Sequence, residues 1–148
     1  MRGVKLYADG GSLLDAGSWI ANGTDAPVES VSTLRTFHAA VTREDERGNP
    51  PGGWRSDERM TRAEALRSMT IWAARANFQE QLVGSIAPGK IADFVVMDRD
   101  WMSIRAADIM GTRVLATYLG GQRVFDADTA KTAVVLRPRP SGCHCRRT

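Results

Sequence analysis

Two stretches of the chain place their apolar side chains at helical spacing. In residues 30–43 the positions that recur every three or four residues are Val31, Leu34, Phe37, His38 and Val41. In residues 61–76 a broad apolar stripe follows Thr61, and Glu64 stands three residues after that threonine. A helix has 3.6 residues per turn, so such positions share one face, and a Thr-x-x-Glu start is a capping box. We predict helices over both stretches, and a short third one over residues 12–16 with Ser12 as N-cap.

Other stretches have the pattern of strands. Residues 18–22 lack polar alternation, which favours a strand buried on both faces, and residues 4–7 are a possible short strand. Near the C-terminal end, residues 94–97, 112–119 and 122–125 read as strands. The last two are separated by Gly120-Gly121, a pair that suits a two-residue hairpin turn.

These elements divide the chain into parts of different character. Residues 1–83 have an α/β pattern, residues 84–130 form a small β unit, and residues 131–148 are a basic tail. The two structured parts are separated by a change from helical to strand spacing near residue 84. Residues 44–59, rich in Gly, Pro and charge, form a long loop, and Trp54 and Arg55 within it are candidates to border a pocket.

The excess of positive over negative charge lies in the tail. Five of the 20 basic residues follow the last acid, Asp128, so the net charge of +3 for the whole chain becomes −2 over residues 1–130. An acidic body and a tail without interleaved aromatic residues argue against nucleic-acid binding. No stretch reaches the roughly 18 apolar residues of a membrane span, and the first residues are polar, so we expect a cytoplasmic protein.

The tail also contains Cys143-His144-Cys145. Thiols and imidazoles are zinc ligands, but a structural zinc site needs four ligands, usually as two spaced pairs. The role of this tripeptide stays open.

One acid stands in an unusual position. In "IANGTDAPVES", residues 20–30, Asp25 follows the apolar run of residues 18–22 and the pair Asn22-Gly23. From the residues alone, Asp25 is either a turn residue or a carboxylate at the end of a strand.

Four segments together resemble the amidohydrolase superfamily. They are "LLDAGSWIANGTDAPVESVSTLRTFHAAVTRED", "MTRAEALRSMTIWAARANFQEQLVGSI", "GSIAPGKIADFVVMDRD" and "VLATYLGGQRVFD". The first is similar to family 3, the branch that contains N-substituted formamide deformylase-like and exoenzyme-regulator-like proteins. The resemblance covers residues 13–126, and Trp72 stands where the family usually has Asn.

The resemblance implies a fold and a chemistry. The chain would be the C-terminal remnant of a metal-dependent (β/α)8 TIM barrel with part of the small β-sandwich domain. Asp25 would end the eighth barrel strand as metal ligand and general base. "RGVKLYADGG" resembles a mid-barrel segment, and Lys5 would be a second metal ligand. The implied metal is divalent, with zinc expected, and the implied substrate is a small-molecule amide whose non-peptide C–N bond is hydrolysed.

Most of the family's metal ligands have no counterpart in this chain. The pattern needs an early His-x-His and two further histidines, whereas the chain has only His38 and His144. His38 falls on a helix without a ligand role, and we interpret it as a packing or surface histidine. We therefore expect a fragment that is inactive alone. The alternative is a non-catalytic subunit or interaction module that completes a partner chain or forms a homo-oligomer.

Overall fold

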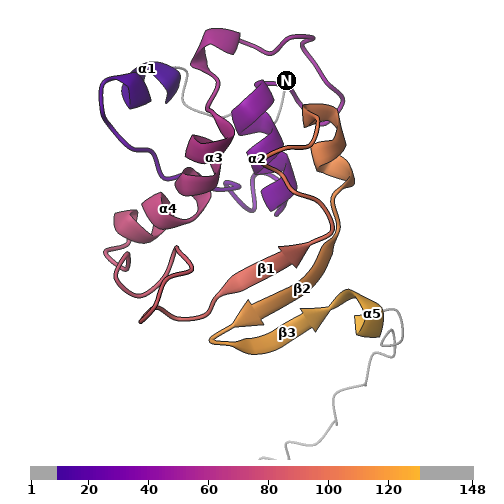
Figure 1. Cartoon of the computed structure of the whole chain (residues 1–148). Helices are drawn as coiled ribbons and strands as arrows, with labels where there is room; N and C mark the ends of the chain where they lie inside the picture. Colours follow the sequence, from indigo (N-terminus) through magenta and orange to yellow (C-terminus); the bar gives the residue numbers. More distant parts are fainter. Residues whose placement is uncertain (1–9, 131–148) are drawn as a thin grey trace, which may run out of the picture.

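The structure is a computed structural model that describes residues 10–130. The elements in chain order are α1 (Gly10–Asp15), α2 (Thr33–Thr42), η1 (Ser56–Glu58), α3 (Arg62–Met69), α4 (Ile71–Ala76), β1 (Phe94–Met97), η2 (Ala106–Gly111), β2 (Val114–Leu119), β3 (Gln122–Asp126) and α5 (Ala127–Ala130). Helices α1 to α4 gather at one end of the molecule, and the three strands lie at the other end together with α5 (Figure 1).

Helix ends follow local capping chemistry. The Ser32 side chain accepts a hydrogen bond from the Arg35 amide at 3.3 Å and starts α2. At the start of α3, Thr61 and Glu64 form the predicted capping box. These bonds satisfy amides that have no partner within the first helical turn.

The predicted helix over residues 61–76 is broken in two. α3 ends at Met69 and α4 begins at Ile71, with Thr70 between them at φ −123° and ψ −96°. The Thr70 hydroxyl donates to the Leu66 carbonyl at 2.7 Å. A threonine that bonds back to its own helix competes with the backbone ladder and bends the helix. The prediction of one continuous helix is therefore wrong.

The core lies among α2, α3 and η2. It consists of side chains at most 8% exposed: Phe37, Ala40, Met60, Ala65, Trp101 and Ile109. The Phe37 and Trp101 rings stack with centroids 4.7 Å apart. The Trp101 indole N–H donates to the Thr112 hydroxyl at 3.1 Å, so its polar atom is satisfied while the ring is buried.

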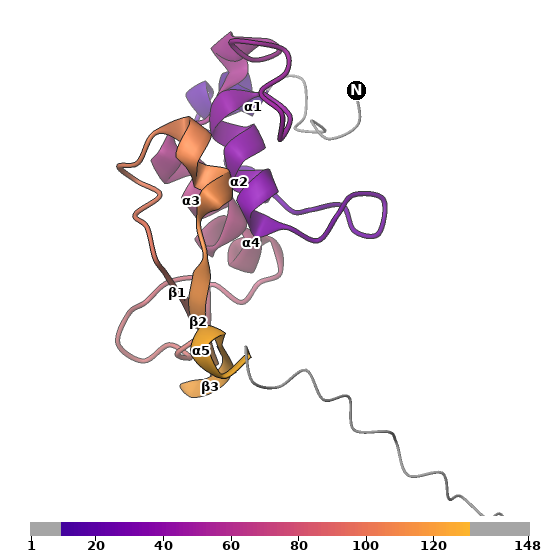
Figure 2. The same cartoon turned by 90° about the vertical axis from the view of Figure 1, so that its right-hand side faces the viewer.

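The strands form one antiparallel sheet in the order β1-β2-β3. β2 and β3 are joined by Gly120 and Gly121, whose φ angles of 58° and 77° are those that a tight hairpin with matching twist requires. The predicted strand over residues 94–97 is present with the same bounds, and the other two begin or end within two residues of their expected positions. Seen from the second direction, the sheet extends away from α1, α2 and α3 (Figure 2).

The strand predicted over residues 18–22 is absent. This segment is not paired with another strand; instead the Asn22 amide donates to the Ser68 carbonyl of α3 at 3.0 Å. An apolar run becomes a strand only beside another strand, and here a helix is its neighbour. The predicted strand over residues 4–7 and the basic tail lie outside the described residues.

The described residues thus make a mixed α/β structure with a three-stranded antiparallel sheet. The origin of these elements in a (β/α)8 barrel and a β-sandwich stays a prediction, as does the division at residue 84. No helix within residues 10–130 is long and apolar enough to cross a membrane.

Candidate functional site around Asp25

Asp25 lies in the connection between α1 and α2, on the surface. Its backbone is in the left-handed region with φ 55°, which Asp tolerates better than most residues. Its carbonyl accepts hydrogen bonds from the amides of Val28 at 2.9 Å and Glu29 at 3.2 Å. Asp25 therefore makes the turn that leads into α2, and its carboxylate is exposed on that turn.

The segment before Asp25 is attached to the helices. Ile20 packs against the core, and the Arg75 guanidinium of α4 lies 4.9 Å from the centre of the Trp19 ring. The hydrogen bond from the Asn22 amide to Ser68 holds the same segment against α3. Residues 19, 20 and 22 are thus held by α4, the core and α3 before the exposed turn begins, which limits where Asp25 can lie.

The second predicted ligand, Lys5, lies outside the described residues. Within residues 10–130, no group of three or more His, Cys, Asp or Glu side chains is placed to hold a metal ion. A zinc site uses three or four protein ligands. The described residues therefore do not fit a complete zinc site by themselves, and Asp25 is the one predicted ligand among them.

His38 is a packing histidine. It is 6% exposed on α2, and the Thr42 hydroxyl donates to its carbonyl at 2.8 Å and lies 3.5 Å from its Nδ1. Burial lowers the pKa of His38, an effect partly opposed by the negative charges of Glu44 and Asp45. This environment favours the neutral imidazole.

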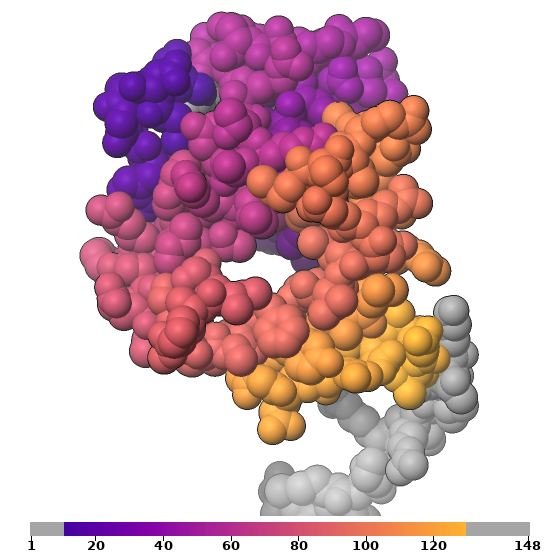
Figure 3. Space-filling view, viewed as in Figure 1, coloured from indigo at the N-terminus to yellow at the C-terminus, as the bar shows by residue number. Residues whose placement is uncertain are grey.

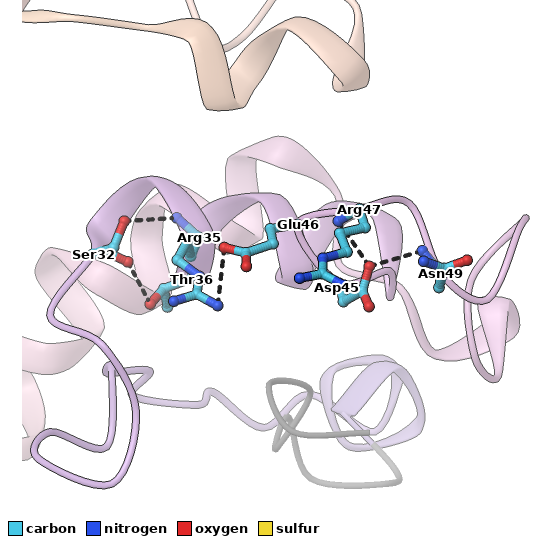
Figure 4. A network of polar contacts seen from close by, with 7 residues as sticks. All are labelled: Ser32, Arg35, Thr36, Asp45, Glu46, Arg47 and Asn49. Carbon is cyan, nitrogen blue, oxygen red and sulfur yellow. Dashed lines mark hydrogen bonds and ion pairs between the residues drawn. The ribbon is translucent and has the colours of Figure 1, made fainter.

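The loop at residues 44–59 is ordered by polar contacts. The Asp45 carboxylate accepts from the amides of Arg47 at 2.8 Å and Asn49 at 2.9 Å, and Arg35 forms an ion pair with Glu46 at 3.0 Å (Figure 4). The first two bonds lower the pKa of Asp45. The loop is tied to α2 by the ion pair and contains the short helix η1.

Sequence reasoning missed Arg43. This residue follows α2, is fully buried, and exchanges two hydrogen bonds with Trp54: its Nε donates to the Trp54 carbonyl at 3.0 Å, and its own carbonyl accepts from the Trp54 amide at 2.9 Å. Its guanidinium carbon lies 5.1 Å from the centre of the Trp54 ring. Burial lowers its pKa, although the charge of Glu58 opposes that effect. Charged side chains are seldom fully buried, so no sequence pattern indicated this.

Glu58 is the second buried charge that the sequence did not indicate. Its carboxylate accepts from the Ser12 amide at 2.8 Å, from the Ser12 hydroxyl at 2.6 Å and from Arg55 at 3.2 Å. The bonds from Ser12 are the main reason that the pKa of Glu58 is lowered. Glu58 thereby attaches α1 to η1, so its role is structural.

Comparisons with known proteins identify the family. The amidohydrolase family model matches residues 2–125. The protein LONG AFTER FAR-RED 3 of Arabidopsis thaliana is 36% identical over 114 residues, which are 77% of this chain and 19% of that protein. N-substituted formamide deformylase of Arthrobacter pascens is 36% identical over 110 residues, 74% of this chain and 20% of the enzyme.

A third relative, YtcJ of Bacillus subtilis (strain 168), is 30% identical over 115 residues, 78% of this chain and 22% of that protein. No solved structure matches. The chain therefore belongs to the amidohydrolase family, which confirms the resemblance given by its motifs. It spans about a fifth of the length of these relatives.

Proposed function

We propose that this chain is a segment of a metal-dependent hydrolase that cleaves carbon–nitrogen bonds other than peptide bonds. The observation that carries the proposal is the family match over residues 2–125, which includes the turn with Asp25. The deformylase relative supports a small amide, and an N-substituted formamide is the first substrate class to examine.

In this proposal Asp25 acts as general base. A carboxylate can accept the proton of the attacking water and return it to the leaving nitrogen. Such general acid–base catalysis typically accelerates a reaction by a factor of about 10²–10⁴. The segment just before this turn is held on α3 and α4, which limits the region in which the Asp25 carboxylate can lie. The proposal also assigns Asp25 and Lys5 as ligands of a divalent metal, zinc by expectation. The remaining ligands would have to come from outside residues 10–130.

A graft tests this function. Residues 2–125 replace the homologous segment of the Arthrobacter pascens deformylase, and hydrolysis of an N-substituted formamide is measured. We expect the graft to hydrolyse the formamide, and we expect no hydrolysis from the same enzyme with the segment deleted. A soluble graft with native-like circular dichroism but no hydrolysis would contradict the proposal.

The same materials address the alternative in which the chain completes a partner. Here the 148-residue chain is added in trans to the deleted deformylase. Recovery of hydrolysis in trans, which is lost when the chain is omitted, would favour a complementing subunit over a covalent segment.

A further inference from the structure

An Asn-Gly pair, Asn22-Gly23, lies directly before the turn with Asp25. Both residues belong to a stretch that is neither helix nor strand. In the space-filling view the chain that follows α1, drawn in indigo, lies on the surface and reaches α4 (Figure 3). Gly23 is exposed and Asn22 is half-buried, so the pair borders solvent.

An asparagine followed by a glycine can react with its own backbone. The glycine nitrogen, after losing its proton to a base in solution, forms a bond to the asparagine Cγ. The Cγ–Nδ2 bond breaks, and the nitrogen takes a proton from water and leaves as ammonia. Water then opens the cyclic imide at either carbonyl, which gives aspartate or isoaspartate. Glycine favours the attack because it has no side chain to obstruct it and its backbone rotates freely.

The attacking nitrogen is free in this structure. Among the hydrogen bonds between residues 10–130, none involves the Gly23 backbone amide. A Cβ built at Gly23 would meet nothing within 4 Å. The Gly23 nitrogen is therefore held neither by a hydrogen bond nor by packing around its residue, and it can turn towards the Asn22 side chain.

The side-chain nitrogen that would leave is not held either. Asn22 Nδ2 is buried and has no hydrogen-bond partner among the residues that the structure describes. Buried donors are normally satisfied, because burial without a partner is unfavourable. Turning this side chain towards Gly23 therefore breaks no hydrogen bond of Nδ2 and relieves an unfavourable burial. The Asn22 backbone amide, by contrast, is fixed by its bond to the Ser68 carbonyl at 3.0 Å.

The other asparagines of the chain lack these conditions. Asn49 is followed by Pro50, whose nitrogen carries no hydrogen and cannot attack. Asn77 is followed by Phe78, whose side chain obstructs the approach. The Phe78 amide also donates to the Arg75 carbonyl at 3.0 Å, so the nitrogen that would attack is already engaged. The same chain thus contains its own comparison for Asn22.

We propose that Asn22 is a site of spontaneous deamidation in the folded chain. Aspartate at this position puts a negative charge where Nδ2 is buried without a partner, and isoaspartate also lengthens the main chain by a carbon atom. Either product weakens the attachment of this segment to α3, directly before the Asp25 turn. The proposal does not depend on the hydrolase function, because the reaction uses the Asn22-Gly23 peptide and not the Asp25 carboxylate.

Peptide mapping by mass spectrometry tests the modification. The 148-residue chain is kept folded in mildly alkaline buffer, and the acid formed at each asparagine is followed over time. We expect Asn22 to convert at least about tenfold faster than Asn77, a ratio that corresponds to about 1.4 kcal/mol of activation free energy. A second sample unfolded in guanidinium chloride gives the rate without the fold. Equal rates at Asn22 and Asn77 in the folded chain, or conversion of Asn22 only after unfolding, would overturn the proposal.

Variants separate the reaction from its effect on the fold. The structure has room for a methyl group at Gly23, so Gly23→Ala should keep the unfolding midpoint of the parent and lose most of the conversion at Asn22. Asn22→Asp reproduces one product and should lower the midpoint, whereas the control Asn77→Asp, at an exposed position, should change it much less. Conversion in Gly23→Ala as fast as in the parent would contradict the mechanism. Equal midpoints for Asn22→Asp and the parent would contradict the loss of attachment.

Discussion

The helices and the sheet of this chain bury their apolar side chains to very different extents. Phe37 and Ile109, at the contact between α2 and η2, are completely inaccessible to solvent. In the sheet, Leu119 is 60% exposed, Val124 59% and Val95 47%. Because burial of apolar surface is the main stabilising contribution, the helical part gains much more from its own contacts than the sheet does. The same chain therefore contains a self-packed part and a part whose faces are open within residues 10–130.

The largest expected effect comes from the centre of the helical core. Phe37→Ala removes a buried ring stacked on Trp101 and should lower the free energy of unfolding by about 3–5 kcal/mol. The matched change in the sheet is Phe125→Ala, where the ring is 40% exposed. Urea unfolding followed by circular dichroism measures both. Equal losses of unfolding free energy in Phe37→Ala and Phe125→Ala would contradict the inference that the helical part is stabilised more by its own packing than the sheet is.

Two adjacent glycines in the loop after α2 differ in how closely the chain packs around them. Gly52 and Gly53 both have positive φ, of 81° and 84°. A Cβ at Gly53 would lie 2.2 Å from the Thr42 carbonyl oxygen, whereas a Cβ at Gly52 meets nothing within 4 Å. Gly53→Ala should therefore destabilise by about 1–3 kcal/mol more than Gly52→Ala. Thermal unfolding of both variants measures this difference, and similar melting temperatures would show that the loop is not packed against Thr42.

The capping box gives a smaller effect. Thr61→Ala removes the hydroxyl that accepts from the Glu64 amide and should cost about 1 kcal/mol. Thr61→Ser keeps the hydroxyl and should restore most of that stability. The readout is the urea midpoint. A Thr61→Ala variant as stable as the parent would mean that α3 is held by packing alone.

The smallest effect concerns pH and the attachment of α1. The pKa of Glu58 is lowered from its usual value of 4.5, chiefly by the bonds from Ser12. A carboxyl with a depressed folded pKa contributes stability that is present above the unfolded pKa and lost as pH falls through the folded pKa. The stability difference between parent and Glu58→Gln should thus be largest above pH 4.5 and should shrink in acid. Urea unfolding at several pH values tests this, with the exposed Asp15→Asn as control. A difference independent of pH would contradict the role of the charge.

Local signals made much of the fold predictable. The capping box at Thr61 and the apolar spacing around Phe37 indicated α3 and α2, and Gly120-Gly121 indicated the hairpin. These signals act within a few residues, so one sequence is enough to read them. The break at Thr70 was not predicted, because it depends on a bond from its hydroxyl to the Leu66 carbonyl rather than on the apolar pattern.

Long-range contacts were harder to predict. Residues 18–22 have the composition of a strand, but their neighbour is α3, and nothing local to the segment specifies that neighbour. Burial of Arg43 depends on Trp54, eleven residues further along the chain. At the candidate site, the sequence suggested either a turn or a catalytic acid for Asp25. The turn is now observed, while the catalytic role stays a proposal and Lys5 lies outside the described residues.

The measurement that tests the central proposal most directly is the rate of formamide hydrolysis by the graft when Asp25 alone is changed. Asp25→Asn keeps the size of the side chain and removes its basicity. The rate should fall by about 10²–10⁴, while the exposed control Asp15→Asn keeps the rate of the unmodified graft. An Asp25→Asn graft that hydrolyses the formamide as fast as this control would contradict the account.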